Sequence, residues 1–516
     1  MSSILETNIG TDAQHESQHA QTADNTSHAL LAAAYDMPQK AAIAAPKADQ
    51  QSLEEILDGL KAPPEHTRAF ADSYGRVTKL ALMLSPYVSG DDRTQMLGAY
   101  KTLFTQMEPD TKFTMVVQTD KDQADIEKVI KDNNVPNPER ITFLRPNVGD
   151  LTVWARDMMV GMYTPDDPTH TALLHQQTLH SWHLNDMQVP GKITAADPSI
   201  VLDTEPFIVT DGGDVQSNTK EAFAGYYSVV SSEMKIAGAI DKDPALKAKV
   251  YDYYQQHYGK QVEDPAAGDL HFPYMKQDRP DGSYQLLPDQ AFQRDAGASP
   301  GKVTEQHALE DLAVKLMEDR FDKPVQIMGR DDPQNPGAEK DPATDHMDMG
   351  CTPIDDKTFL VGDPSLAKDA IATMSSNEKQ AVEDVLSKRA GYPVKLPEQG
   401  PFEPHNRDDQ SDFDAYAHIL ESKGYKVVRV PHLEPPKAGD PYISYNNCLM
   451  ERFEKDGKEV RRVFLPHYGV QKLDDMADKV WESQGFEVHP IPLNALSAEW
   501  GALRCVSNWL DRSPRG

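Results

Sequence analysis

Short runs of hydrophobic residues alternate along this chain with segments whose apolar positions recur at helical spacing. Residues 80–84, 113–117 and 141–144 are apolar runs of strand length, and the segments at 96–103 and 125–130 carry apolar residues on one helical face. Strands that alternate with helices in this way are typical of α/β proteins. The pattern therefore predicts an α/β fold.

The alternation continues through the rest of the chain, and no segment of the sequence repeats another. Predicted strands lie at 158–163, 207–209, 325–328, 358–362, 425–430, 442–447 and 463–466, with a further one beginning at 486. Predicted helices have their apolar faces at 309–317, 413–420 and 473–481. We expect the strands 442–447 and 463–466 to pair through the polar turn at Asp456-Gly457.

Two parts of the chain depart from this pattern. Residues 1–50 are rich in Ser, Thr, Gln, His, Asp and Ala and show little apolar periodicity, which predicts a disordered tail. Order should begin near Ser52, a residue suited to the N-cap of a helix, and 51–512 should form one domain. Within it, 233–305 is irregular and rich in Pro, Gly and Asp. We interpret this stretch as an insertion, helical in its early part, that covers the functional site.

Composition limits where the chain is expected to work. Hydrophobic residues make up 39% of it and charged residues 26%, and no run approaches the roughly 20 apolar residues of a membrane span. The first six residues lack a basic region followed by an apolar core, which argues against a secretory signal. We therefore expect no membrane partner and a cytoplasmic location. Export through the N-terminal tail without a cleavable signal is the alternative.

The charge balance narrows the range of partners. The chain has 82 Asp and Glu against 52 Lys and Arg, a net charge of −30. Such a surface repels phosphate backbones, so nucleic acid is excluded as a partner, and it favours cationic ligands. The three cysteines, Cys351, Cys448 and Cys505, lie far apart and do not form a disulfide framework, which predicts reduced thiols.

Two motifs in the first half of the chain carry acidic residues beside predicted strands. Trp154-Ala155-Arg156-Asp157 stands immediately before a strand, at a sheet end where ligands of α/β proteins bind. Asp211-Gly212-Gly213-Asp214-Val215 joins two glycines, which permit close approach, to carboxylates that suit a cation. Taken singly, the first motif also fits a surface ion pair and the second an ordinary hairpin turn.

Two later motifs supply a histidine and a thiol. In a strand-like segment His346 and Asp348 would point to the same side and address one ligand together. No Cys-x-x-Cys or His-x-x-x-His spacing accompanies them, so we predict no metal site. Cys505 stands in a turn between Gly501 and Ser507-Asn508. As a thiolate it is the best side-chain nucleophile, whereas an isolated cysteine is more often a small buried apolar residue.

The order of these motifs carries more information than any one of them. Trp-x-Arg-Asp at 154–157, Asp-Gly-Gly-Asp-Val at 211–215, His-x-Asp at 346–348 and Gly-x-x-x-Cys-x-Ser-Asn at 501–508 together resemble the guanidino-group-modifying enzymes of the pentein superfamily. The run from 442 to 505 looks most like the agmatine deiminase and peptidylarginine deiminase branch. The motif at 211–215 looks more like the dimethylarginine hydrolases. The resemblance implies a five-bladed α/β propeller of ββαβ-type units that works without a cofactor.

The resemblance also implies a role for each motif residue. Cys505 would attack the guanidinium carbon, and His346 would be the general acid and base. Asp157 and Asp348 would accept hydrogen bonds from the guanidinium, and Asp211 would orient His346 or bind substrate. Trp154 and Asp214 complete the predicted substrate-binding set.

Arg504 departs from the family pattern, which commonly has histidine immediately before the nucleophile. We expect its positive charge to lower the pKa of Cys505. A cation that faced the pocket would instead repel the substrate.

The implied reaction converts a guanidino group of arginine or an arginine derivative to a ureido group, with release of ammonia. A planar, delocalised guanidinium is a poor electrophile, so a thiolate is a suitable nucleophile and the intermediate would be a covalent thiouronium. The substrate is either a small metabolite or a protein arginine. Two alternatives stay open: amidino transfer to an amine, and a guanidine-binding protein that has lost catalysis. The sequence does not define the oligomeric state.

Overall fold

The structure is a computed structural model, and its description is limited to part of the chain. The described residues are 67–177, 185–241, 243–263, 274–278, 284–288, 298–329, 332–334, 344, 346–396, 409–433, 443–496 and 501–515. The predicted tail at 1–50 and the predicted helix near Ser52 lie outside them.

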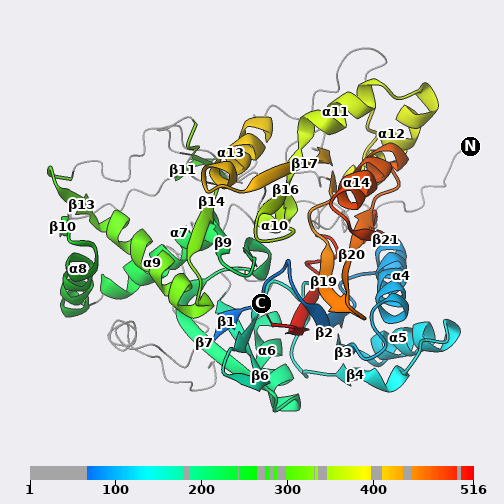
Figure 1. Cartoon of the computed structure of the whole chain (residues 1–516), viewed down its shortest axis with the longest axis horizontal. Helices are drawn as coiled ribbons and strands as arrows, with labels where there is room; N and C mark the ends of the chain where they lie inside the picture. Colours follow the sequence, from blue (N-terminus) through cyan, green and yellow to red (C-terminus); the bar gives the residue numbers. More distant parts are fainter. Residues whose placement is uncertain are drawn as a thin grey trace, which may run out of the picture.

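Five of the sheets formed by the described residues share one strand pattern (Figure 1). Each contains a strand that pairs antiparallel with one neighbour and parallel with another. A parallel pair needs a crossover connection, and in an α/β protein this is usually a helix. The prediction of an α/β fold is confirmed.

The first sheet joins the two ends of the described chain in the order β22-β2-β3-β4. Leu80 in β2 is paired with Trp509 in β22, so the turn of Cys505 runs directly into this sheet. Helix α5 begins with a capping box between Thr119 and Asp122. The strands are β2 (Arg76–Leu84), β3 (Lys112–Val117), β4 (Ile141–Leu144) and β22 (Ser507–Ser513), and the helices are α4 (Gly90–Gln106), α5 (Asp120–Asp132) and η1 (Pro138–Arg140).

The second sheet follows the motif at 154–157 and has the order β1-β5-β6-β7. Its long hairpin, β5 to β6, has a register shift next to Tyr163. The strands are β1 (Arg68–Ala69), β5 (Met159–Thr164), β6 (Asp167–Gln177) and β7 (Ile200–Val209), and the connection to β7 contains η3 (Asp186–Gln188) and α6 (Val189–Ala196). The predicted strands at 158–163 and 207–209 are confirmed as β5 and the end of β7.

The third sheet, β14-β9-β8, carries the region that we interpreted as an insertion. Its elements are η4 (Gly212–Asp214), β8 (Val215–Ser217), β9 (Ala222–Gly225), α7 (Tyr226–Ile240), α8 (Pro244–Tyr258), α9 (Glu305–Phe321) and β14 (Val325–Met328). Two small sheets pair β10 (Gln261–Glu263) with β13 (Lys302–Thr304) and β11 (Tyr274–Asp278) with β12 (Tyr284–Pro288).

The interpretation of 233–305 as an irregular cover over the site is corrected for its described part. The helical start is confirmed by α7, and α8 is a regular helix whose buried residues include Leu246, Val250 and Tyr253. These residues belong to a hydrophobic cluster with α7 and α9, so α8 is held by helix packing. In Figure 1, α8 lies at the left edge of the molecule, away from the C-terminal end of the chain.

The fourth sheet, β15-β16-β17-β18, follows the motif at 346–348. Helix α12 has a capping box between Ser375 and Glu378 and ends at Gly391, which has a φ of 72°. The strands are β15 (Cys351–Pro353), β16 (Thr358–Asp363), β17 (Lys426–Leu433) and β18 (Ile443–Ser444), and the helices are α10 (Met347–Gly350), α11 (Pro364–Ala372), α12 (Ser376–Ala390) and α13 (Asp409–Ser422).

The fifth sheet, β19-β20-β21, corrects one predicted hairpin. The turn at Asp456-Gly457, with φ values of 53° and 73°, joins β19 (Leu449–Lys455) to β20 (Lys458–His467). Two consecutive residues with positive φ match the twist of a tight hairpin. The residues Ile443–Ser444 instead form β18, which pairs with β17. The remaining elements are α14 (Gln471–Ser483), as predicted, and β21 (Glu487–Pro492).

The largest hydrophobic cluster connects the first sheet to the two motif loops that lie at its end. Its buried members include Trp154, Leu503 and Cys505 together with side chains of β2, β3 and α4. The thiol is therefore part of a packed core, where position is well defined. Among the described residues no helix is both long and apolar enough to cross a membrane.

Candidate active site

The Cys505 turn is joined to the motif at 154–157 through backbone contacts. The Arg156 amide donates to the carbonyl of Cys505 at 2.9 Å, and Asn508 Nδ2 donates to the carbonyls of Ala155 and Met159 at 3.1 and 2.7 Å. Gly501 packs against the Trp154 ring so closely that an added Cβ would overlap the indole. These contacts fix the thiol relative to Asp157, the last residue of the motif.

Asn447 also holds the thiol and the backbone before it. Its Nδ2 lies 3.1 Å from Cys505 Sγ as a donor, and its Oδ1 accepts from the amides of Arg504 and Cys505 at 2.9 and 3.3 Å. Asn447 is absent from the predicted site. In the sequence it is only the last residue of the predicted strand 442–447, and it lies 57 positions before Arg504, so no local motif connects the two.

His346 is the residue before α10 and has an extended backbone, with φ −108° and ψ 130°. Its Nε2 lies 3.6 Å from Asp211 Oδ2, and its Nδ1 lies 3.9 Å from Asp157 Oδ1. The ring occupies the space over Gly213, where an added Cβ would overlap it. The glycines were expected to let another group come close to the backbone, and at Gly213 the group that does so is the His346 imidazole.

The expectation that 346–348 is strand-like is wrong, because Asp348 lies in the short helix α10. The conclusion that His346 and Asp348 address one place nevertheless agrees with the structure. Ligand atoms of His346, Asp348 and Cys505 lie within 4.8 Å of one another. A four-residue helix that starts after His346 brings both side chains to the thiol.

The ionisation of the pair His346 and Cys505 is set by burial and by the surrounding carboxylates. Burial alone would lower the pKa of His346, but its contacts with Asp211, Cys505 and Asp157 raise that pKa well above 6.5. Burial and then Asp348 raise the pKa of Cys505, while His346 opposes the rise. The resting site therefore favours a protonated imidazole beside a thiol, and a bound cation would favour the thiolate.

The expected net lowering of the Cys505 pKa beside Arg504 is corrected: burial and the negative charge of Asp348 raise that pKa, and the positive charge of Arg504 does not outweigh them. Arg504 is buried and its guanidinium turns to two carboxylates. Nη1 donates to Asp348 Oδ2 at 2.7 Å, and Nη2 donates to Asp72 Oδ1 at 2.9 Å. Asp72 is a second residue missing from the predicted site, and it lies 432 positions away from Arg504.

Asp214 and Trp154 have structural contacts in the described site. The carboxylate of Asp214 accepts from the Met347 amide at 3.2 Å and from the amide and hydroxyl of Ser228. It therefore anchors α10 to the start of α7. Trp154 packs its ring on Gly501 and meets Tyr87 edge to face, with 6.4 Å between ring centroids. Their predicted contact with substrate stays a prediction.

The spacing of His346, Asp348 and Cys505 would also suit a metal ion. One oxygen of Asp348 is already bound by the buried guanidinium of Arg504. Sγ of Cys505 likewise accepts from Asn447 Nδ2 at 3.1 Å, so two of the three possible ligands are already engaged. We therefore do not assign a metal to this cluster.

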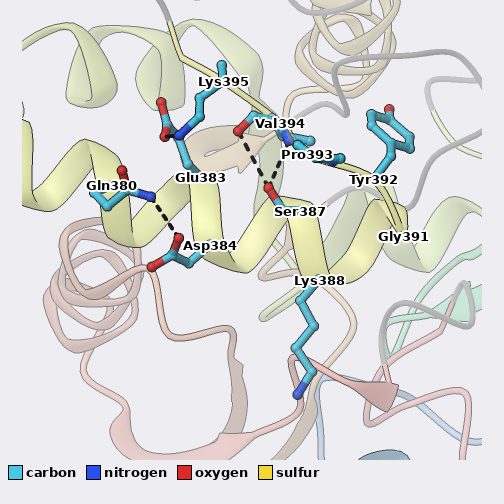
Figure 2. A pocket seen from close by; sticks show the side chains of 10 residues that line it. All are labelled: Gln380, Glu383, Asp384, Ser387, Lys388, Gly391, Tyr392, Pro393, Val394 and Lys395. Atoms are coloured by element: carbon cyan, nitrogen blue, oxygen red, sulfur yellow. Dashed lines mark hydrogen bonds and ion pairs between the residues drawn. The ribbon is translucent and has the colours of Figure 1, made fainter.

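A surface hollow of about 460 Å³ lies elsewhere, on α12 and the residues that follow it, and shares no residue with this cluster (Figure 2). Its polar side chains are largely paired with one another: Lys395 contacts Glu383, Gln380 donates to Asp384, and Ser387 accepts from the Val394 amide. It contains no nucleophile beside a base, so we place the candidate active site at Cys505.

Comparison with solved structures gives matches that extend over most of the chain. The agmatine deiminase of Enterococcus faecalis has 12% sequence identity, a TM-score of 0.47 and coverage of 89% of this chain and 97% of its own. An agmatine deiminase of C. jejuni has 8% identity, a TM-score of 0.43 and coverage of 86% and 96%. An amidinotransferase from Microseira wollei has 10% identity, a TM-score of 0.35 and coverage of 87% and 97%.

The two agmatine deiminases carry the name of an enzyme that the sequence motifs resemble. No family model and no curated protein matches the sequence. At such identities and TM-scores we infer the function from the side chains of the site.

Proposed function

We propose that this protein is a cysteine-dependent guanidine deiminase of the pentein superfamily, with Cys505 as nucleophile. The observation that carries the proposal is the cluster of His346, Asp348 and Cys505 within 4.8 Å, with Asp157 and Asp211 facing the imidazole. A nucleophile, an acid-base group and carboxylates for a cation are the parts that guanidinium chemistry needs. In this proposal the five sheets are the blades of a propeller, and 51–512 is its catalytic domain.

The reaction begins when the substrate cation enters among the carboxylates. Asp157 and Asp348 hold the guanidinium through its N–H groups, and its positive charge favours ionisation of the Cys505 thiol. The thiol proton passes to water, and Sγ forms a bond to the guanidinium carbon. The tetrahedral adduct then breaks a C–N bond to leave the thiouronium. His346, whose pKa is raised by Asp211 and Asp157 against the effect of burial, remains protonated and gives its proton to the departing ammonia.

The second half of the reaction uses the neutral imidazole that remains. His346 takes a proton from water, the resulting hydroxide attacks the thiouronium carbon, and the C–S bond breaks. The products are the ureido compound and the free thiol. Water and a guanidine are consumed, and ammonia and a urea derivative are formed, so no redox partner or cofactor is required.

One observation favours a second candidate, a guanidine-binding protein without turnover. Arg504 already occupies one oxygen of Asp348, which reduces the acceptors left for a substrate. Two measurements on the same samples separate the candidates: binding of a guanidine by calorimetry, and ammonia release. Binding without ammonia would support the second candidate.

The test of the proposal is a screen for ammonia and for ureido product over agmatine, arginine, methylarginines and arginyl peptides. We expect at least one of these to be turned over by the wild-type protein, and Cys505→Ala to lose at least about three orders of magnitude in kcat. Cys351→Ala is the matched control, because Cys351 is buried in β15 outside the cluster. Full activity of Cys505→Ala would overturn the proposal.

A further inference from the structure

Every donor of the Arg504 guanidinium is engaged. An arginine offers five N–H groups. Nε donates to Asp72 Oδ1 at 3.1 Å and Nη2 donates to the same oxygen and to the Val215 carbonyl, at 2.9 and 2.8 Å. Nη1 donates to Asp348 Oδ2 and to the Gly212 carbonyl, at 2.7 and 3.1 Å. Such a side chain has one orientation and cannot move without losing several hydrogen bonds.

Asp348 is held by this guanidinium at one oxygen only. Oδ2 accepts from Arg504, whereas Oδ1 is buried and accepts no hydrogen bond from the described residues. The side chain has no exposed surface. A buried carboxylate oxygen without a donor is costly unless a ligand supplies one. One carboxylate oxygen of Asp348 lies within 4.8 Å of ligand atoms of both His346 and Cys505, so a ligand bound among these three residues is close enough to supply that donor.

Asp72 binds the other side of the same guanidinium, and we call the chain of Asp72, Arg504 and Asp348 the bridge. Its Oδ2 accepts from the Ser217 amide at 2.8 Å, and its own amide donates to the Ser217 carbonyl at 2.7 Å. Burial would lower the pKa of Arg504, but Asp72 and Asp348 together raise it, so the guanidinium stays charged. One fixed cation therefore stands between two buried carboxylates.

We propose that Arg504 and Asp72 are positioning residues for Asp348: their ion pair fixes one oxygen of Asp348 and leaves the other for a single hydrogen bond from a guanidinium ligand. The identity of that ligand rests on the proposed function, whereas the bridge itself does not. The bridge also offsets the negative charge that Asp348 places beside the nucleophile.

The test measures the pH dependence of Cys505 alkylation without any substrate, followed on the Cys505 peptide by mass spectrometry. The groups that act electrostatically on this thiol include Asp348, Asp157, His346, Arg156 and Tyr468. The charge of Arg504 stands next to this set, on Asp348 Oδ2. Three variants of the bridge and one control are compared with the wild type: Arg504→Gln, Asp72→Asn, Arg504→Lys, and Asp348→Asn as the control for direct removal of a negative charge.

The expected shifts have opposite signs. Arg504→Gln removes a positive charge and should move the alkylation profile upward by about one pH unit, a tenfold change in the thiolate fraction. Asp72→Asn removes one of the two carboxylates that share the positive charge of Arg504, so this charge then compensates Asp348 alone. The alkylation profile should therefore move downward, as it should in Asp348→Asn. Arg504→Lys keeps the charge but loses the planar fork that spans two acids. Its profile should stay near that of the wild type, while kcat/KM for the best substrate of the screen falls at least tenfold.

A purely structural role for Arg504 would lower the melting temperature of these variants without shifts of opposite sign, and that result would overturn the inference. If Arg504→Gln does not fold, Asp72→Asn decides: a profile that is unchanged or moves upward contradicts the bridge. Opposite shifts in a protein that turns over no guanidine would leave the bridge standing and overturn the proposed function. Turnover of a guanidine without shifts of opposite sign would leave the proposed function standing and overturn the bridge.

Discussion

At the residue scale, negative charge is concentrated around the thiol. Asp157 and Asp211 both face the His346 ring, and Asp348 keeps one oxygen without a donor among the described residues. Buried carboxylates are unfavourable unless a cation and hydrogen-bond donors accompany them. A cationic ligand would therefore relieve the site as it binds, which is the physical basis for expecting a guanidinium there.

The first prediction concerns Asp157, which we propose holds the substrate guanidinium together with Asp348. Asp157→Asn should lower kcat/KM for the best guanidine substrate at least about 30-fold, because truncating one partner of a buried charge pair costs about 2–5 kcal/mol. Asp166→Asn is the matched control, since Asp166 is exposed on the turn between β5 and β6. Steady-state kinetics that are the same in both variants would show that Asp157 does not bind the substrate.

At the element scale, the Cys505 turn and the 154–157 loop, which are far apart in sequence, are packed and hydrogen-bonded to each other. The Cys505 turn and the 154–157 loop are linked by the backbone contact of Arg156 and by Asn508, and they pack through Gly501 and Trp154. The nucleophile is thus placed by the close approach of a glycine to an indole. Any side chain at 501 would separate the two loops.

The second prediction follows from that contact. Gly501→Ala should lower the free energy of unfolding by about 1–3 kcal/mol, the usual cost of overpacking, and should reduce activity because the thiol is displaced. The same substitution at Gly98 is the control. Gly98 is exposed in helix α4 with open space around it, so Gly98→Ala should stabilise the protein by about 0.5–1 kcal/mol. Denaturant unfolding of both variants measures the contrast, and equal effects would contradict the role of the contact.

The elements that the sequence could predict are those with an apolar pattern. The strands at 141–144 and 325–328 coincide with β4 and β14. The strand β22 was missed because polar residues make up most of it. Its Arg512 and Asn508 are buried through hydrogen bonds to backbone carbonyls, which leaves no apolar run to recognise. α10 was missed because four residues are too few to show a helical period.

The candidate site was predictable only as far as its motifs are local. Cys505, His346, Asp348 and Asp157 each stand in a short recognisable motif, and the structure brings them together. Asn447 and Asp72 have no such signal. Their contacts to the Cys505 turn span tens to hundreds of residues and exist only once the sheets are assembled. The direction of the Cys505 pKa was mispredicted because burial, which the sequence does not reveal, has the largest effect.

At the scale of the whole molecule, stability should depend on the protonation of buried groups. Burial raises the pKa of Asp214 to about 7, and the charge of His346, followed by the hydrogen bonds with Ser228 and Met347, only partly opposes this. An unfolded aspartate titrates near 3.9. Between these values the folded protein holds the extra proton, so the contribution of Asp214 to stability is fully present below about pH 4 and is lost as the pH rises through 7.

The third prediction is therefore a change in slope. The free energy of unfolding of the wild type should lose, through Asp214, about 1.4 kcal/mol per pH unit near pH 5 and about half of that per pH unit near pH 7. Asp214→Asn carries no titratable group there, so its stability should gain on that of the wild type over this range. Denaturant unfolding at four pH values, with Asp166→Asn as control, tests this. Parallel curves for the wild type and Asp214→Asn would contradict the account.

The most direct test of the central claim is the mass of the protein quenched in acid during turnover of a guanidine. Deimination by Cys505 predicts an adduct on the Cys505 peptide equal to the substrate minus ammonia, and this mass must change with the substrate. Amidino transfer would instead leave the same small amidino group on Cys505 for every substrate. Ureido product formed with no adduct on Cys505, in samples quenched while turnover is under way, would contradict the covalent mechanism.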